Sequence, residues 1–134
     1  MTGFKRILLA EDDEDDKMIF SEILNELKTD YHFHFDAVDN GLQIVQLLRQ
    51  DEALPDLVVL DQNMPQMNGK ETLEVIKSDP RLKHIPVVIY STYNDGRLSD
   101  ECLRIGATQI ITKPDSFEGF RTMILMLVTQ YLRQ

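Results

Sequence analysis

Residues 57–69 decide how this chain folds, and they read Leu57-Val58-Val59-Leu60-Asp61-Gln62-Asn63-Met64-Pro65-Gln66-Met67-Asn68-Gly69. Four apolar residues in a row end at a carboxylate, and a proline and a glycine then turn the chain. An apolar run of this length is typical of a strand buried on both faces, as in a parallel sheet covered by helices. Asp61 is therefore expected where a central strand ends, at the edge where open α/β sheets bind their ligands.

Strand and helix patterns alternate on both sides of this stretch. Apolar runs predict strands at 5–10, 56–60, 86–90 and 108–112, and alternating apolar and polar residues predict one at 31–37. Helical spacing of apolar residues predicts helices that begin near residues 13, 41, 69, 98 and 117. Such alternation predicts an α/β fold with right-handed crossovers and helices on both faces of a parallel sheet. Because the second strand alternates like an edge strand, we expect a flavodoxin-like (βα)5 doubly wound, five-stranded parallel sheet of order 2-1-3-4-5.

Length and charge limit the class of protein. The 134 residues fit one domain, so we expect a single domain over 1–134 with no output domain. A formal net charge of −9 argues against a nucleic-acid partner, which would require a basic surface. Apolar runs stay well short of the roughly 20 residues of a membrane span, and the N-terminus lacks a secretion signal, so no membrane partner is expected. The single cysteine, Cys102, excludes an intramolecular disulfide, and we expect a cytoplasmic protein.

Parallel strands all end at one edge of the sheet, which gathers polar residues from four strand ends. Glu11 and Asp12 follow the first strand, Asp61 ends the third, Ser91 follows the fourth and Lys113 follows the fifth. Three carboxylates held close together repel one another, so at pH 7 they require a cation or shared protons. Oxygen ligands with positions left to water are what Mg²⁺ prefers. Mg²⁺, an ammonium and a hydroxyl around one nucleophilic carboxylate are the components of a phosphoryl-transfer site.

Five motifs in register carry a resemblance to a known family. They are Ile7-Leu8-Leu9-Ala10-Glu11-Asp12-Asp13, the 61–69 stretch, the Ser91-Thr92 loop, Gly106-Ala107 and Lys113-Pro114. Together they resemble the receiver domain of two-component response regulators, and the likeness covers the whole chain. The resemblance implies a single-domain, phosphorylation-dependent signalling switch. It would accept a phosphoryl group on Asp61 from a sensor histidine kinase or a phosphotransfer protein.

The resemblance also implies a metal site. Glu11, Asp12, Asp61 and the backbone carbonyl of Asn63 would bind Mg²⁺, directly or through water. Such a protein is not an enzyme that turns over a substrate, because it catalyses only its own phosphorylation and slow autodephosphorylation. The acids at 14–16 are interpreted instead as a solvated helix start that complements the helix dipole.

Three further expectations concern the groups around the phosphoryl site. By resemblance, Lys113 would bind a phosphoryl oxygen and precede a cis peptide bond to Pro114, and Ser91 would be the switch hydroxyl. Many relatives have a rotating aromatic ring three residues before the lysine, where this chain has Ile110. The ring of Tyr93 is expected to shield the phosphoryl group from water.

The expected output is a contact with another protein. Beside the core stripe of the last helix, Met123 and Met126 are expected to form a second apolar strip. That strip would suit a partner surface, such as a downstream protein or a homodimer through the last helices, or it would pad the edge of the core.

Three other classes of protein share parts of this pattern. A phosphatase of the haloacid-dehalogenase type needs a second Asp two residues after its nucleophile, where this chain has Asn63. A flavodoxin needs a phosphate loop rich in Ser, Thr and Gly after its first strand, where the acids of this chain would repel the FMN phosphate. A degenerate receiver, acting as a phosphorylation-independent protein-binding module, is the alternative function, and it predicts a missing acid or lysine.

Overall fold

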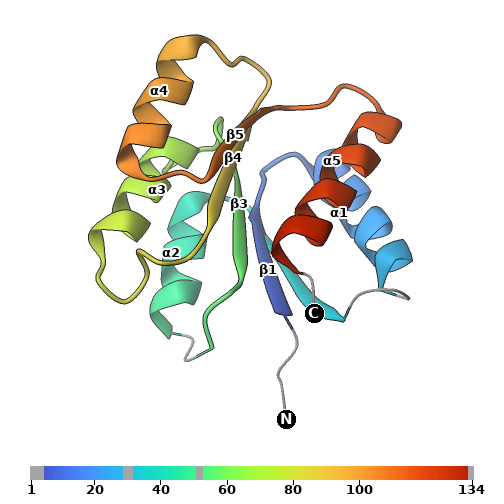
Figure 1. Ribbon diagram of the computed structural model, residues 1–134, viewed down its shortest axis with the longest axis horizontal. Coiled ribbons are helices and arrows are strands. Elements are labelled where there is room, and N and C mark those ends of the chain that lie inside the picture. The colour runs from blue at the N-terminus through green and yellow to red at the C-terminus, as the bar shows by residue number, and fades with distance from the viewer. Residues whose placement is uncertain (1–4, 29–31, 51–52, 133–134) are drawn as a thin grey trace.

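The computed structural model describes residues 5–28, 32–50 and 53–132, which form five strands and five helices in strict alternation (Figure 1). Their bounds are β1 Lys5–Ala10, α1 Glu14–Leu27, β2 Phe33–Val38, α2 Gly41–Gln50, β3 Leu57–Asp61, α3 Gly69–Ser78, β4 Val87–Ser91, α4 Gly96–Ile105, β5 Gln109–Thr112 and α5 Phe117–Tyr131. All neighbouring strands pair in parallel, in the order β2-β1-β3-β4-β5. The predicted flavodoxin-like sheet and its strand order are confirmed.

Helices cover both faces of the sheet, and each face has its own apolar core. α1 and α5 lie against one face, and α2, α3 and α4 lie against the other (Figure 1). Because successive side chains of a strand point to opposite faces, β1 contributes Ile7 and Leu9 to the first core and Leu8 and Ala10 to the second. All five residues of β3 are buried, as the apolar run predicts. The central strands are therefore held from both sides.

Helix ends follow local capping chemistry. α4 begins at Gly96, two residues earlier than the apolar pattern predicts, because the Asp95 side chain accepts a hydrogen bond from the Leu98 N–H at 2.9 Å. It ends at Gly106, whose φ of +132° suits a residue without a side chain at the C-terminal cap. β2 runs from Phe33 to Val38, one residue past its predicted end, and its predicted start at Tyr31 lies outside the described residues.

The loop after β3 folds back tightly on the strand end. The Gly69 N–H donates to the Gln62 carbonyl at 3.1 Å, and a Cβ at Gly69 would lie 2.8 Å from the Asp61 carbonyl oxygen. Asn68 then caps α3, and its side chain and that of Glu71 each accept a hydrogen bond from the other's backbone N–H. Asp61 is thus held at a rigid strand end by a loop that needs glycine at one position.

The last helix differs from its predicted surface. Met123 is 5% exposed and packs in the core beneath α1 and α5, so it does not form an exposed strip with Met126, which is 41% exposed. The exposed apolar neighbour of Met126 is Leu125. None of the helices in the described ranges combines the length and apolar composition needed to cross a membrane.

Candidate functional site

Two strand ends bring three acidic side chains together. Glu11 directly follows β1, Asp12 comes next, and Asp61 is the last residue of β3. One carboxylate oxygen from each of the three lies within 4.8 Å of the others. Glu11 and Asp61 are buried, at 0% and 3% exposed, whereas Asp12 is exposed to solvent. The cluster therefore has two acids shielded from water and one that solvent can reach.

The start of α1 orders the acids that follow β1. Asp13 is the N-cap, and its Oδ1 accepts hydrogen bonds from the backbone N–H groups of Asp15 and Asp16 at 2.9 and 3.1 Å. The Asp13 N–H in turn donates to Glu11 Oε2 at 3.0 Å. Because the cap fixes the first turn, Asp16 is turned back toward the sheet edge.

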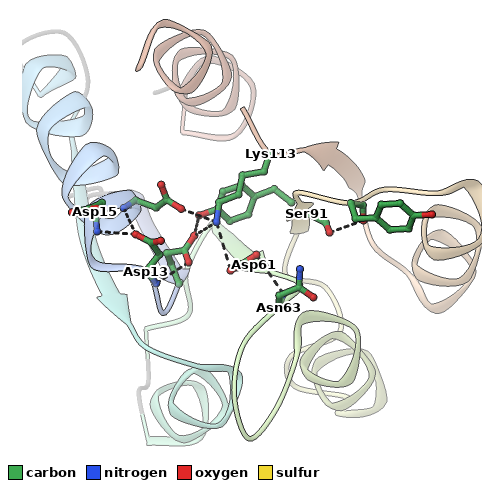
Figure 2. A network of polar contacts seen from close by, with 10 residues as sticks. Asp13, Asp15, Asp61, Asn63, Ser91 and Lys113 are labelled. Atoms are coloured by element: carbon green, nitrogen blue, oxygen red, sulfur yellow. Dashed lines mark hydrogen bonds and ion pairs between the residues drawn. The ribbon is translucent and has the colours of Figure 1, made fainter. Parts of the chain in front are cut away.

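Lys113 reaches from the end of β5 into this group of acids (Figure 2). Its Nζ lies 2.7 Å from Asp16 Oδ2, 2.9 Å from Glu11 Oε1 and 3.7 Å from Asp61 Oδ2. Burial lowers the pKa of Lys113, but hydrogen bonds to Asp16 and Glu11 outweigh it and the pKa rises, so the ammonium stays charged. Asp16, interpreted from the sequence as a solvated residue, is in fact the closest carboxylate to Lys113.

Asp61 is an unusually weak acid in this setting. Burial, the largest cause, raises the pKa of its carboxyl from 3.8 to about 7, and the charge of Glu11 acts in the same direction. Lys113 and the backbone N–H of Asn63, which lies 3.4 Å from Asp61 Oδ1, oppose the rise. Near neutral pH the folded protein therefore holds this carboxyl between its neutral and charged forms, where a nearby cation can displace the proton.

Tyr90, the residue before Ser91 on β4, extends the network into the core. Its side chain is fully buried, its hydroxyl donates a hydrogen bond to Glu11 Oε1, and its ring centroid lies 5.1 Å from Lys113 Nζ. Burial and the charge of Glu11 raise the pKa of Tyr90, so the phenol keeps its proton. Sequence reasoning placed Tyr90 only in a buried strand. The signal available was its hydroxyl, since a buried tyrosine usually finds a hydrogen-bond partner.

Ser91 is buried at the end of β4, but its hydroxyl is satisfied elsewhere. Ser91 Oγ donates to the Tyr93 carbonyl at 2.8 Å, and Figure 2 shows this bond on the side of Ser91 away from Asp61. Tyr93 is 74% exposed, and the shielding of the phosphoryl group expected from the sequence stays a prediction. Tyr93 thus contributes its backbone carbonyl as the acceptor for the Ser91 hydroxyl.

The backbone joins the ends of β4 and β5. The Lys113 N–H donates to the Ser91 carbonyl at 2.8 Å, which continues the pairing of the two strands. The peptide bond between Lys113 and Pro114 is trans, so the cis bond implied by the resemblance was wrong. Trans is also the lower-energy isomer before proline, by about 0.5–1 kcal/mol. Ile110 is half-buried and packs against the core beneath α2, α3 and α4.

A divalent cation fits the donor chemistry of this cluster. The three side-chain ligands are carboxylate oxygens, which Mg²⁺ prefers, and the exposed Asp12 leaves a side open to water. Burial is the main cause of the raised pKa of Asp61, and the charge of Glu11 adds to it; a bound cation would offset both effects by favouring the charged carboxylate. Among the described residues, this is the group of acids that lies close enough to share one ion.

Comparison with known proteins identifies the family. A family model described as "Response regulator receiver domain" matches residues 7–125. The chain belongs to this family. The receiver domain is 33% identical over 116 residues to the two-component response regulator ORR1 of rice, Oryza sativa subsp. japonica. That match covers 84% of this chain and 50% of the relative, so the chain spans about half the length of ORR1.

Two solved structures show the same fold over nearly the whole receiver domain. The phosphorylated cyanobacterial phytochrome response regulator RcpA superimposes with a TM-score of 0.89 at 30% identity, covering 97% of this chain and 95% of that one. The Mn²⁺-bound form of the response regulator Rcp1 has a TM-score of 0.87 at 27% identity, with coverage of 97% and 96%. One of these structures is thus of a phosphorylated protein and the other of a metal-bound one.

Proposed function

We propose that this receiver domain is a phosphorylation-dependent signalling switch that accepts a phosphoryl group on Asp61 in the presence of Mg²⁺. The observation that carries the proposal is the position of Asp61, which is buried beside the Lys113 ammonium and within reach of two further acids. The phosphorylated state of RcpA and the Mn²⁺ of Rcp1 support it by similarity. The phosphoryl donor would be a phosphohistidine on a sensor histidine kinase or a phosphotransfer protein.

The proposed reaction is a single displacement at phosphorus. An Asp61 carboxylate oxygen attacks the phosphorus of phosphohistidine, a P–O bond forms, the P–N bond breaks, and the leaving imidazole takes up a proton. The product is 4-aspartylphosphate, which water hydrolyses slowly back to the carboxylate. Asp61 must be ionised to attack, so any group that lowers its pKa from about 7 favours the reaction at neutral pH.

The neighbouring residues have distinct roles in this proposal. Glu11, Asp12, Asp61 and the Asn63 backbone carbonyl would hold Mg²⁺, which when bound offsets the negative charge of the acids and of the phosphoryl oxygens. Lys113 would bind a phosphoryl oxygen as a point charge. It already lies 3.7 Å from Asp61, so a small side-chain movement is enough to reach the new oxygens.

Ser91 is the proposed switch hydroxyl. In the present structure it donates to the Tyr93 carbonyl, and it would exchange that acceptor for a phosphoryl oxygen. The phosphoryl group adds a charge of about −1.5 to −2 and three strong acceptor oxygens, which gives the loop after β4 a new preferred arrangement. A two-state equilibrium biased by these contacts is sufficient for signalling.

The proposed output is a protein–protein contact made in the cytoplasm. Downstream proteins and a second copy of the chain, docked through the last helices, are the candidate partners. Exposed apolar side chains on α5, Leu125 and Met126, are available for such contacts.

Incubation with Mg²⁺ and acetyl phosphate, read by intact mass, tests the proposal. We expect an adduct of one phosphoryl group on the natural chain and on Asp100→Asn, a matched change of an exposed aspartate on α4. We expect none on Asp61→Asn or after Mg²⁺ is removed with EDTA. A natural chain that stays unmodified, but still captures partners, would favour the degenerate receiver instead.

A further inference from the structure

Glu11 is a buried carboxylate whose oxygens already have protein partners. Oε1 accepts hydrogen bonds from the Tyr90 hydroxyl and from Lys113 Nζ, the latter at 2.9 Å. Oε2 accepts one from the Asp13 backbone N–H at 3.0 Å. Each carboxylate oxygen offers two lone pairs, so the two donors on Oε1 occupy its capacity. Oε2 is left with one lone pair for an ion or an ion-bound water.

The Tyr90 hydroxyl is fixed in place by the packing of its ring. The ring makes edge-to-face contacts with Phe20 of α1, at a centroid distance of 5.8 Å, and with Phe120 of α5, at 6.5 Å. Both phenylalanines are buried in the core, and Tyr90 itself has no exposed surface. A phenol held between two helices cannot turn away from Glu11 without disturbing both contacts.

Lys113 shares the same anchor. Its Nζ lies 5.1 Å from the centroid of the Tyr90 ring, within the range of a cation–π attraction, and contacts the oxygen of Glu11 that Tyr90 also contacts. One buried side chain on β4 therefore touches an acid at the end of β1 and the ammonium that follows β5.

We propose that Tyr90 is a positioning residue for the metal site: its hydroxyl holds Glu11 Oε1 in place, so that the remaining lone pair of Oε2 stays available to the divalent cation. The inference rests on the proposed function of the site. Hydrogen-bond partners of metal ligands orient those ligands, and their loss typically weakens metal affinity by roughly 10–100-fold. Removing the Tyr90 hydroxyl would free Oε1 to rotate into the cluster and would leave Lys113 as its main partner.

Tyr90→Phe separates this role from packing, because phenylalanine keeps the ring and removes only the hydroxyl. Tyr131→Phe is the matched control, since the Tyr131 hydroxyl accepts from Gln109 Nε2 at the far end of the last helix. Mg²⁺ binding is measured directly by calorimetry without a phosphodonor, and thermal unfolding is measured in EDTA. We expect about tenfold weaker Mg²⁺ binding for Tyr90→Phe, at the low end of that range, and natural affinity for Tyr131→Phe.

A second measurement does not depend on the variant folding. In the natural chain labelled with ¹³C at the tyrosine Cζ, addition of Mg²⁺ should shift the Tyr90 resonance and leave that of Tyr131 in place. An unchanged Mg²⁺ affinity in Tyr90→Phe, or a Tyr90 resonance that does not shift when Mg²⁺ is added, would overturn the proposed role of Tyr90 in positioning Glu11. A natural chain that binds no Mg²⁺ and accepts no phosphoryl group overturns the proposed function itself, so the two failures are distinct.

Discussion

Replacing Asp61 with asparagine should stabilise the metal-free protein, and the gain should depend on pH. Folding raises the pKa of Asp61 from 3.8 to about 7, so between these values the folded state keeps a proton that the unfolded chain has lost. The free energy of unfolding of the natural protein therefore falls as pH rises through this window and levels off above pH 7. An asparagine side chain has nearly the same shape and does not titrate, so the free energy of unfolding of Asp61→Asn does not show this fall with rising pH.

The size of the effect follows from the width of the window. Each pH unit between the two pKa values is worth about 1.4 kcal/mol. From pH 5 to pH 7 the folded carboxyl is still mostly protonated while the unfolded one is charged, and above pH 7 both are charged. Only these two pH units therefore contribute, and from pH 5 to pH 8 the unfolding free energy of Asp61→Asn rises relative to that of the natural protein by about 3 kcal/mol. Groups that titrate equally in both proteins cancel in this comparison.

Urea unfolding in EDTA at pH 5, 6, 7 and 8 measures this difference. Asp100→Asn, an exposed aspartate on α4, is the control, and its free energy relative to the natural chain should stay within about 0.5 kcal/mol at every pH. A difference between Asp61→Asn and the natural protein that is the same at pH 5 and pH 8 would refute the reasoning, because it would mean that Asp61 titrates normally in the folded state.

Three further outcomes are expected. Asp16→Asn removes one contact of Lys113 and a nearby negative charge, so Lys113 pairs more closely with Asp61. The pH midpoint of modification by acetyl phosphate should therefore move lower, and an unchanged midpoint would contradict the assignment of Asp16 to the site. Tyr93→Ala should leave the half-life of the phosphorylated protein within about twofold, since the ring is 74% exposed, and a several-fold shorter half-life would restore the shielding role. Asn68→Ala removes the reciprocal cap of α3 and should lower the free energy of unfolding by about 1 kcal/mol in urea, whereas Asn25→Ala, at an exposed position within α1, serves as the comparison.

The fold could be predicted from the sequence because its signals are local and repeated. The apolar run before Asp61 marks a strand buried on both faces, and β3 is such a strand. The alternation around Phe33 and Phe35 marks the edge strand, and β2 lies at the edge of the sheet. Element ends were less predictable, since they depend on single side chains such as Asp95, whose cap starts α4 two residues early.

The gathering of Glu11, Asp12, Asp61 and Lys113 at one edge also follows from the sequence, because parallel strands end together. The direction of side chains within that edge does not follow from it. Asp16 is one of several acids at a helix start, and only the capped first turn of α1 shows that it faces Lys113.

Burial of individual side chains was the second unpredictable quantity. Met123 and Met126 are three residues apart on one helix, yet one lies in the core and the other in solvent. The ring of Tyr93 is exposed and that of Tyr90 is buried, although the two stand three residues apart in one short segment. Such differences depend on how α5 and the loop after β4 meet the sheet, which is a property of packing between distant parts of the chain.

The hydrogen bond from the Lys113 amide to the Ser91 carbonyl has a consequence for the rate at which the switch changes conformation. The Ser91 hydroxyl and the Lys113 ammonium are the groups proposed to bind the phosphoryl oxygens. They project from the ends of β4 and β5, and the backbones of these two strands are already hydrogen-bonded to each other. Reorganisation can then be confined to rotamers and a few loop dihedrals, leaving the sheet ladder closed. Rotamer changes take roughly picoseconds to nanoseconds and loop motions roughly nanoseconds to microseconds, so the lifetime of the signal would be set by hydrolysis and not by the conformational step.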